Sequence, residues 1–252
     1  MRILKELGLF FKRKLKETLR QPVWVISGLM TPLLYILLFA PLLKNMGYPP
    51  RTTADVLNGF VPGILTLLAF STGMGSGWTI IHELETGVIE RLRVTPASRF
   101  SMLMGTVLTD IIDFLVPGIL VVVISSCFAF SVHLLGLVIL MLLLCLLTAV
   151  VSAWSSSLGL ILKQVGSLAA VMTGLQLPLT LLSGVLLPLS LGPGWLRVIA
   201  HINPMYYAVE ASRVLAAGVI NSAETVTAFS IMVPLTAFVL WWATGIYRKT
   251  VA

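Results

Sequence analysis

The residues whose order most resembles a catalytic motif are His82 and Glu83, which match the start of the HExxH motif of zinc metalloproteases. That motif places two histidines one helical turn apart, so that both bind zinc while the glutamate acts as general base. The second histidine would fall at position 86, where this chain has Thr86. The sequence also lacks the GxSxG pattern of serine hydrolases. We therefore predict no catalytic residue and no metal site.

Asp110 and Asp113 are the acidic residues of an otherwise apolar stretch, and their spacing places them on one face of a helix. A charged side chain at the centre of a bilayer costs at least about 2.5 kcal/mol on insertion scales, so both should face protein or water. Two interpretations stay open. The pair forms the polar lining of a substrate path or a coupling contact, or it is hydrated and structural in the cytoplasmic extension of its helix, which the nearness of Arg99 slightly favours.

The chain carries no GxxxxGK[ST] motif, whose glycine-rich loop would cradle nucleotide phosphates. We expect no cofactor in this chain, so any use of ATP and magnesium must come from another polypeptide. The net charge of +7 does not indicate a nucleic-acid partner, because seven of the 17 Lys and Arg lie in the first 20 residues. Cys127 and Cys145 lie within apolar runs and predict no disulfide.

The elements that must position these residues are membrane spans. Hydrophobic residues make up 58% of the 252 residues and charged residues only 11%, which leaves too little polar surface for a soluble domain. A span needs roughly 20 mostly apolar residues, so the sequence predicts an all-α integral membrane protein with one transmembrane domain over 1–252. The six expected transmembrane helices cover residues 23–43, 60–81, 105–130, 134–162, 168–187 and 226–247.

The distribution of cations predicts the orientation of these spans. With the N-terminus inside, thirteen of the 17 Lys and Arg fall in cytoplasmic segments, which include residues 1–20, Lys163, Arg248 and Lys249. The positive-inside rule therefore places both termini and residues 82–99 in the cytoplasm.

Two further segments predict helices that do not cross the membrane. Residues 1–20 place apolar side chains on one stripe and most of their cations off it, which is typical of an interfacial amphipathic helix with its cations toward lipid headgroups. A positive flank with no further role is an equally weighted interpretation. Residues 188–218 are apolar but interrupted by prolines and glycines, which predicts a re-entrant or interfacial hairpin on the outer side.

Residues 82–99 concentrate charge between two apolar segments. They predict a short amphipathic helix that ends at Thr95–Pro96, since a residue before proline disfavours the α conformation. Ile89 and Leu92 supply an apolar edge. Such a helix fits a groove on a partner protein through apolar anchors and a charged rim. The other interpretation, a solvated connector, predicts a less apolar and less structured loop.

Two separate motifs of the chain are similar to those of a known family. The run Glu85-x-Gly87-x-x-Glu90-Arg91-Leu92-x-x-Thr95-Pro96 resembles the cytoplasmic coupling segment of ABC-2 type transporter permeases, the group that includes daunorubicin-resistance permeases. A second stretch resembles the signature before the last span of that family and includes Asn203, Pro204, Tyr206, Glu210 and Arg213. One departure is Leu84, which stands where the family often has a basic residue.

The resemblance implies a permease subunit of an ATP-driven exporter, not an enzyme. Two copies, as a homodimer or a heterodimer with a related chain, would pair with two ABC ATP-binding subunits. The segment with Glu85, Gly87, Glu90, Arg91 and Leu92 would dock into the ATPase, and 188–218 would be an outer re-entrant region. We expect a multi-pass protein of a bacterial plasma membrane that exports an amphipathic drug, antibiotic or lipid-like substrate by alternating access.

Three alternatives stay open at this point. Within the same class, the substrate could be a lipid-linked glycan. A membrane-embedded enzyme would have to use Asp110, Asp113 or His82, and the sequence shows no complete catalytic constellation around them. An ion-coupled secondary transporter would be expected to carry more intramembrane acids and an internal repeat.

Overall fold

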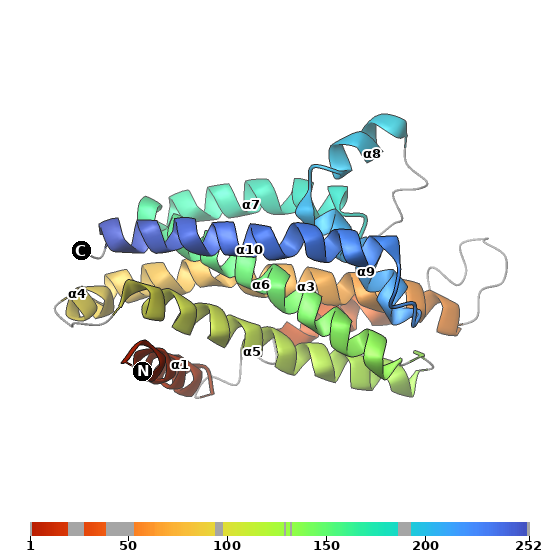
Figure 1. Cartoon of the computed structure of the whole chain (residues 1–252), viewed down its shortest axis with the longest axis horizontal. Helices are drawn as coiled ribbons and strands as arrows, with labels where there is room; N and C mark the ends of the chain where they lie inside the picture. The colour runs from red at the N-terminus through yellow and green to blue at the C-terminus, as the bar shows by residue number, and fades with distance from the viewer. Residues whose placement is uncertain are drawn as a thin grey trace.

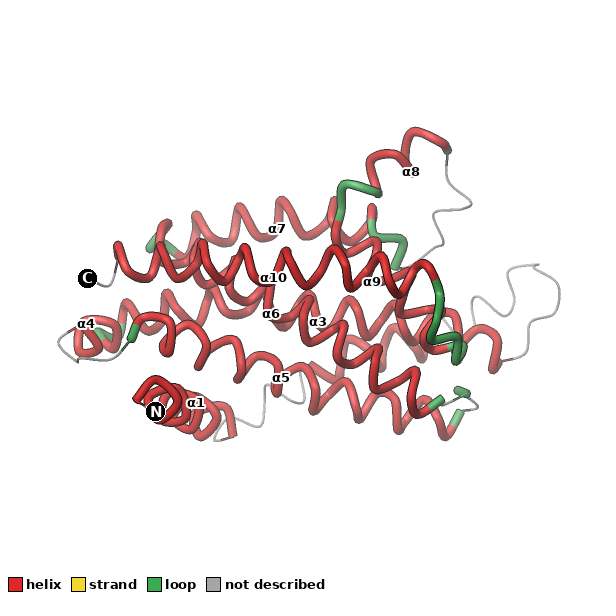
Figure 2. Tube along the Cα trace, in the orientation of Figure 1, coloured by secondary structure: helices red, strands yellow, loops and turns green. Residues whose placement is uncertain are grey.

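The computed structural model describes residues 2–19, 28–38, 53–93, 98–128, 130–131, 133–185 and 193–250, and every regular element among them is a helix (Figures 1 and 2). The prediction of an all-α membrane protein is confirmed. The labelled helices are α1 (Arg2–Leu19), α3 (Thr53–Glu85), α4 (Val88–Arg93), α5 (Arg99–Cys127), α6 (Leu134–Leu162), α7 (Val165–Leu182), α8 (Gly194–Ala200), α9 (Pro204–Ala216) and α10 (Ala223–Thr250).

Five of these helices, α3, α5, α6, α7 and α10, are long and apolar enough to cross a bilayer. The first expected span, residues 23–43, lies partly outside the described residues, and its described part is the apolar helix Gly28–Leu38. The structure therefore provides five candidate spans, and the sixth stays a prediction.

The end of α3 differs from the expected boundary between the second span and the charged segment. The helix does not stop at residue 81 but continues to Glu85. The separate charged helix, α4, begins only at Val88. His82, Glu83 and Glu85 consequently belong to the end of a long span, because no turn residue interrupts the helix before Thr86–Gly87. The prediction that Glu85 shares the short helix of Glu90 and Arg91 is wrong.

Two other helices begin or end at identifiable signals. α5 starts at Arg99, before the expected residue 105, because the Ser98 hydroxyl caps it by accepting the N–H of Ser101 at 3.1 Å. α7 ends at Leu182, before the expected residue 187, and the chain then turns through Gly184, whose φ is 72°. Glycine adopts this left-handed conformation without steric cost.

α3 and α6 form the centre of the bundle, where small residues let their backbones approach. A Cβ at Gly73 would lie 2.8 Å from the Cβ of Val151, and one at Gly77 would lie 2.7 Å from the Ser155 hydroxyl. That hydroxyl accepts the N–H of Gly77 at 2.9 Å and donates to the carbonyl of Met74 at 2.6 Å. Close packing and interhelical hydrogen bonds of this kind hold helices together in lipid.

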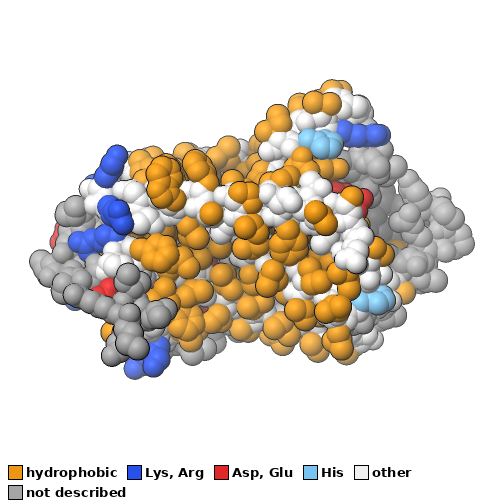
Figure 3. All heavy atoms as spheres, viewed as in Figure 1, with side chains coloured by type: hydrophobic (Ala, Val, Ile, Leu, Met, Phe, Trp, Pro, Cys, Tyr) orange, Lys and Arg blue, Asp and Glu red, His pale blue; other side chains and the backbone are white. Residues whose placement is uncertain are grey.

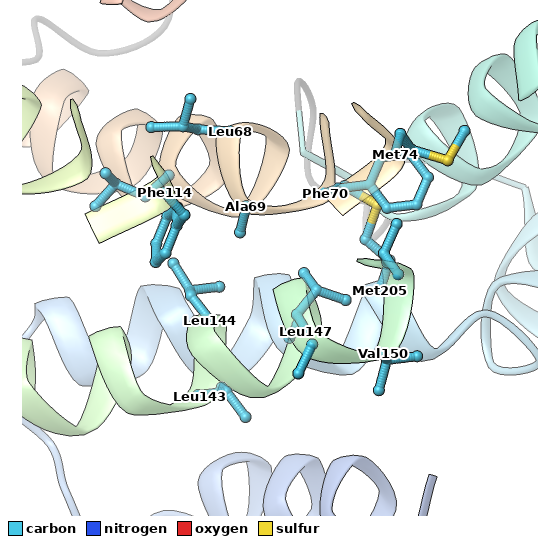
Figure 4. Packing of buried hydrophobic residues seen from close by; sticks show 14 of the residues in the cluster. Leu68, Ala69, Phe70, Met74, Phe114, Leu143, Leu144, Leu147, Val150 and Met205 are labelled. Carbon is cyan, nitrogen blue, oxygen red and sulfur yellow. The ribbon is translucent and has the colours of Figure 1, made fainter. Parts of the chain in front are cut away.

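Larger apolar side chains fill the space around the contact between α3 and α6 (Figure 4). Phe70 from α3, Phe114 from α5, Leu144 from α6 and Met205 from α9 are all buried. Because four helices contribute to one cluster, the short helix α9 is part of the core and not a peripheral loop.

Apolar side chains also cover the outside of the bundle. Figure 3 shows them across the middle of the visible face, whereas Lys and Arg gather mainly at the end where α1, α4 and the end of α10 lie. Val138 and Leu142 on α6, and Phe238 and Trp241 on α10, are each more than half exposed. An apolar surface this extensive is favourable against lipid, so the chain is a multi-pass membrane protein.

α1 crosses the end of the bundle instead of running along it. It is seen nearly end-on in Figures 1 and 2, while the long helices lie across the picture. Its main contact is with α5, where a Cβ at Gly105 would lie only 2.8 Å from the Cβ of Phe10. The glycine therefore provides the close approach that seats α1 on the bundle.

Candidate functional site

The predicted coupling segment lies at the cation-rich end of the molecule, at the tip of α3 (Figure 1). Ile89 of α4 is 1% exposed and anchors the helix against the bundle. Glu85, Glu90 and Arg91 are exposed. The segment therefore presents a charged surface on an apolar anchor, as a docking helix requires. The backbone of Leu92 lies within α4.

The turn between α3 and α4 depends on Gly87. Its φ is 68°, and its N–H donates to the carbonyl of Leu84 at 3.1 Å, which closes the end of α3. Its own carbonyl accepts the N–H of Arg91 at 3.2 Å and so begins the hydrogen bonding of α4. Since a side chain would be strained at this φ, glycine fixes the direction in which α4 leaves α3.

Glu83 joins the tip of α3 to the crossing helix α1. Its Oε1 lies 3.1 Å from Arg13 Nη2 and 3.2 Å from Lys14 Nζ, and its side chain is only 8% exposed. The prediction that the off-stripe cations of residues 1–20 point to lipid headgroups is therefore wrong for Arg13, which faces the bundle. A buried carboxylate attracts the cations because the interaction is stronger away from water.

Two more contacts tie α1 to α5. The Glu6 carboxylate accepts the backbone N–H of Ser98 at 2.9 Å, next to the start of α5. The Thr18 hydroxyl donates to Asp113 at 3.5 Å. α1 is thus held at both of its ends and, through Glu83, near its middle, so its position is coupled to those of α3 and α5.

A small cavity of about 20 Å³ lies under α4, where α1, α3, α5 and α10 meet. Glu83, Lys14 and the buried Tyr247 line its polar side, and Ile89 of α4 lines its apolar side. This volume holds about one water molecule, because a site needs about 10–15 Å³ for one. α4 therefore rests directly on a charged, tightly packed junction of four other helices.

Asp110 lies among serines of two neighbouring helices. Its Oδ2 accepts hydrogen bonds from the hydroxyls of Ser76 on α3 and Ser152 on α6, and these hydroxyls are 2.9 Å apart. Asp110 and Asp113 are both half-buried. The Asp110 carboxylate therefore links three helices, which agrees with the structural role that the second interpretation gives the pair. A role of the pair in a substrate pathway stays a prediction.

Asn203 and Pro204 begin α9 in the second motif. The Asn203 side chain accepts the N–H of Met205 at 3.0 Å and donates to the carbonyl of Leu179 on α7 at 2.7 Å. Pro204 occupies the first helical turn, where a missing N–H costs nothing. The motif thus starts a helix and fixes it to α7 with one side chain.

Arg213 and Glu210 fix the rest of α9. Arg213 donates to Glu210 at 2.9 Å and to the carbonyl of Gly184, just past α7, at 2.6 Å. Tyr206 is half-buried beside them, and burial together with the Glu210 carboxylate raises its pKa. The predicted outer region 188–218 contains two short helices, α8 and α9, of which α8 exposes Trp195. The five motif residues therefore come together around α9 and the end of α7.

Comparison with known proteins decides the family. The model of the ABC-2 type transporter family matches residues 5–217, which cover both motifs. The chain belongs to the ABC-2 type transporter family. Its relatives are named as transport permeases, so the chain is a membrane-spanning transport permease.

Individual relatives of this ABC-2 permease come from plastids and bacteria. The transport permease ycf38 of Cyanophora paradoxa is 31% identical over 226 residues, which cover 84% of this chain and 74% of that protein. The daunorubicin resistance ABC transporter permease protein DrrB1 of Streptomyces coeruleorubidus is 26% identical over 199 residues, covering 78% and 70%. The inner membrane transport permease YadH of Escherichia coli K12 is 35% identical over 147 residues, covering 58% and 56%.

The sequence of this ABC-2 permease does not predict all of the contacts at this junction. Glu83 reads only as one charge of a longer segment, and no pattern predicts the contacts of Asp110 with Ser76 and Ser152. One signal was present: Lys14 follows Leu7 and Phe11 on the apolar stripe of α1, where a cation needs a buried partner. The serines carry no such signal, because small polar residues are common wherever membrane helices pack.

Proposed function

We propose that this permease is the membrane-spanning half of an ATP-driven exporter, in which α4 docks into a separate ABC ATP-binding subunit. The observation that carries the proposal is the geometry at the tip of α3: α4 buries Ile89 and exposes Glu90 and Arg91, and Glu85, the last residue of α3, is exposed beside it. A solvated connector, the other interpretation, predicts a less structured loop without a buried apolar anchor.

The connection from α4 to the bundle supports transmission of force. α3 is a continuous helix of 33 residues that packs along α6, so displacement of its tip moves the whole span. The pairing of Glu83 with α1 ties the crossing helix to the same tip. ATP binding by the partner would shift the permease between inward- and outward-open states through its different affinity for each. Two ATPases would act on two permease copies, related or identical.

Orientation and cargo follow from charge and composition. The cation-rich end, with both termini and α4, faces the cytoplasm in this proposal, as the positive-inside rule requires. The described spans are mainly apolar, which favours an amphipathic cargo such as a drug, an antibiotic or a lipid-like molecule. DrrB1 is named for daunorubicin resistance, so daunorubicin is a suitable probe of efflux from a bacterial plasma membrane.

A double substitution of Glu90→Ala and Arg91→Ala tests the docking of α4. Because both side chains are exposed, the thermal unfolding midpoint of the purified permease should not change. With the ATP-binding subunit co-expressed, cellular efflux is measured as ATP-dependent uptake of daunorubicin into inverted vesicles. We expect this rate to fall about tenfold, as loss of roughly 1.4 kcal/mol of docking energy predicts.

The control is His82→Gln, which changes an exposed residue at the same end of the molecule but outside α4. It should leave efflux unchanged. If the double variant retained full efflux and bound the ATP-binding subunit normally in pull-down assays, α4 would not be the docking helix.

A further inference from the structure

A groove of about 740 Å³ lies on the surface of the bundle near the C-terminal end of α10, beside the start of α5. Its volume falls within the range of small-molecule sites, about 300–1,000 Å³. Trp241 of α10 and Phe100 of α5 line it and are 74% and 40% exposed. Arg248 and Lys249 line its far end. The groove thus joins an apolar wall to a pair of cations.

Gly245 keeps the middle of the groove hollow. A Cβ at this position would meet nothing within 4 Å, and α10 continues as a regular helix on both sides. Glycine is unfavourable inside a helix relative to alanine. Because a side chain at position 245 would meet no other part of the chain, packing within the chain does not explain the glycine. Trp241, Gly245 and Arg248 are spaced by four and then three residues, which places an aromatic wall, a hollow and a cation in line on one helix face.

The cations at the end of the groove are available to a ligand. Arg248 and Lys249 are exposed, and neither forms an ion pair within the part of the chain that the structure describes. Figure 3 shows that Lys and Arg gather at this end of the molecule. An apolar hollow next to two unneutralised cations suits a ligand with an apolar tail and an anionic head.

The position of the groove along α10 matches the depth of a lipid headgroup. Tryptophan side chains concentrate at the membrane interface, and Trp241 and Trp242 both line the groove. At 1.5 Å per residue, Arg248 lies roughly 10 Å further along the axis than Trp241. The headgroup region of each leaflet is about 5–8 Å thick, so the cations reach the level of lipid phosphates while the aromatic wall reaches the acyl chains.

A second copy of the chain is a poorer occupant of this face. Two copies inserted in the same orientation are related by an axis along the membrane normal, so a symmetric contact brings each residue opposite residues of the same depth. A contact through the groove would set the cations of one copy against those of the other. A lipid phosphate between the helix and water instead neutralises them.

We propose that this groove binds one anionic phospholipid, with its phosphate at Arg248 and Lys249 and an acyl chain over Gly245 against Trp241. The site selects charge through the cations and accepts the tail through the hollow. It stands apart from the docking of α4, because lipid binding needs neither an ATP-binding subunit nor transport.

Native mass spectrometry of the purified, delipidated full chain tests the site, with phosphatidylglycerol and phosphatidylcholine of matched acyl chains as probes. The wild type should retain phosphatidylglycerol in preference to phosphatidylcholine. Arg248→Gln and Lys249→Gln should each reduce that preference about fivefold, the factor expected for one cation near a lipid headgroup. Gly245→Leu should reduce retention of both lipids, because its side chain occupies the hollow and its Cβ would meet nothing within 4 Å.

Lys163→Asn is the matched control, since Lys163 is an exposed cation outside the groove and asparagine tolerates its φ of 55°. It should leave the preference unchanged. Equal retention of the two lipids by the wild type would overturn the proposal, and so would an equal loss in the Lys163 variant. If Gly245→Leu converted a dimer into monomers while lipid retention stayed constant, the groove would be a contact between subunits.

Discussion

The Glu83 carboxylate lies at the point where α1 crosses the tip of α3, within 3.1 Å of Arg13 and 3.2 Å of Lys14. Its side chain is 8% exposed and that of Lys14 is 12% exposed, whereas Arg13 is 37% exposed. The pair with Lys14 is therefore the nearly buried one, in which each charge depends on the other. The same carboxylate lines the cavity beneath α4, next to Ile89.

Replacement of Glu83 by Gln should lower the free energy of unfolding by about 3 kcal/mol, because it leaves the nearly buried Lys14 without a counter-charge. Chemical unfolding of the purified protein in detergent measures this loss. The double variant Glu83→Gln with Lys14→Met should recover much of it, since no unpaired charge remains in the contact. A single Glu83 variant as stable as the wild type would show that the ion pair contributes nothing to the fold.

At the scale of elements, the packing of α3 on α6 depends on which face each glycine occupies. Gly73 points at α6, where a Cβ would lie 2.8 Å from the Cβ of Val151 and 2.9 Å from the carbonyl of Thr148. Gly75, two residues along, has nothing within 4 Å of such a Cβ. Two glycines of one helix therefore have different roles, although the sequence presents them as one cluster of small residues.

This difference predicts opposite effects of the same substitution. Gly73→Ala should destabilise the protein by about 1–3 kcal/mol, the usual cost of overpacking, because backbone atoms of α6 must move. Gly75→Ala should be neutral or stabilising by up to about 1 kcal/mol, the helix preference of alanine over glycine. Thermal unfolding of the two variants in detergent provides the comparison. Equal effects would mean that α3 and α6 are not in close contact at Gly73.

At the scale of the whole molecule, the two ends of the bundle differ in their content of Lys and Arg. Lys163 follows α6 at the end that carries α1 and α4, whereas Asn221 precedes α10 at the opposite end. Both residues are exposed. Orientation in a membrane is set by the excess of cations near the cytoplasmic ends of spans, so these two positions should lie on opposite sides.

Cysteine labelling tests this orientation in a background of Cys127→Ser and Cys145→Ala. With a membrane-impermeant maleimide added to intact cells, Asn221→Cys should be labelled and Lys163→Cys should not. Inverted vesicles should reverse the pattern, which also controls for the reactivity of each thiol. Labelling of Lys163→Cys in intact cells would invert the topology and place α4 outside.

The sequence by itself determined the elements of this protein that depend on local pattern. Long apolar runs specify membrane helices, because lipid cannot hydrogen-bond to an open backbone and each span must satisfy its own. The bounds of α6 follow from residues close together in the chain. The order of the two motifs also indicated the family, and the match over residues 5–217 confirmed it.

Only the tertiary structure decided which face of each helix meets which neighbour. Rotation of a helix about its axis is set by packing against other helices, and an apolar stripe is a weak guide where every side of a helix faces apolar surroundings. For this reason the pairing of Glu83 with Lys14, the contacts of Asp110 with two serines, and the hollow at Gly245 emerged only from the folded bundle. The first two depend on residues far apart in the chain. The hollow depends on the space between packed helices, which a local sequence pattern does not predict.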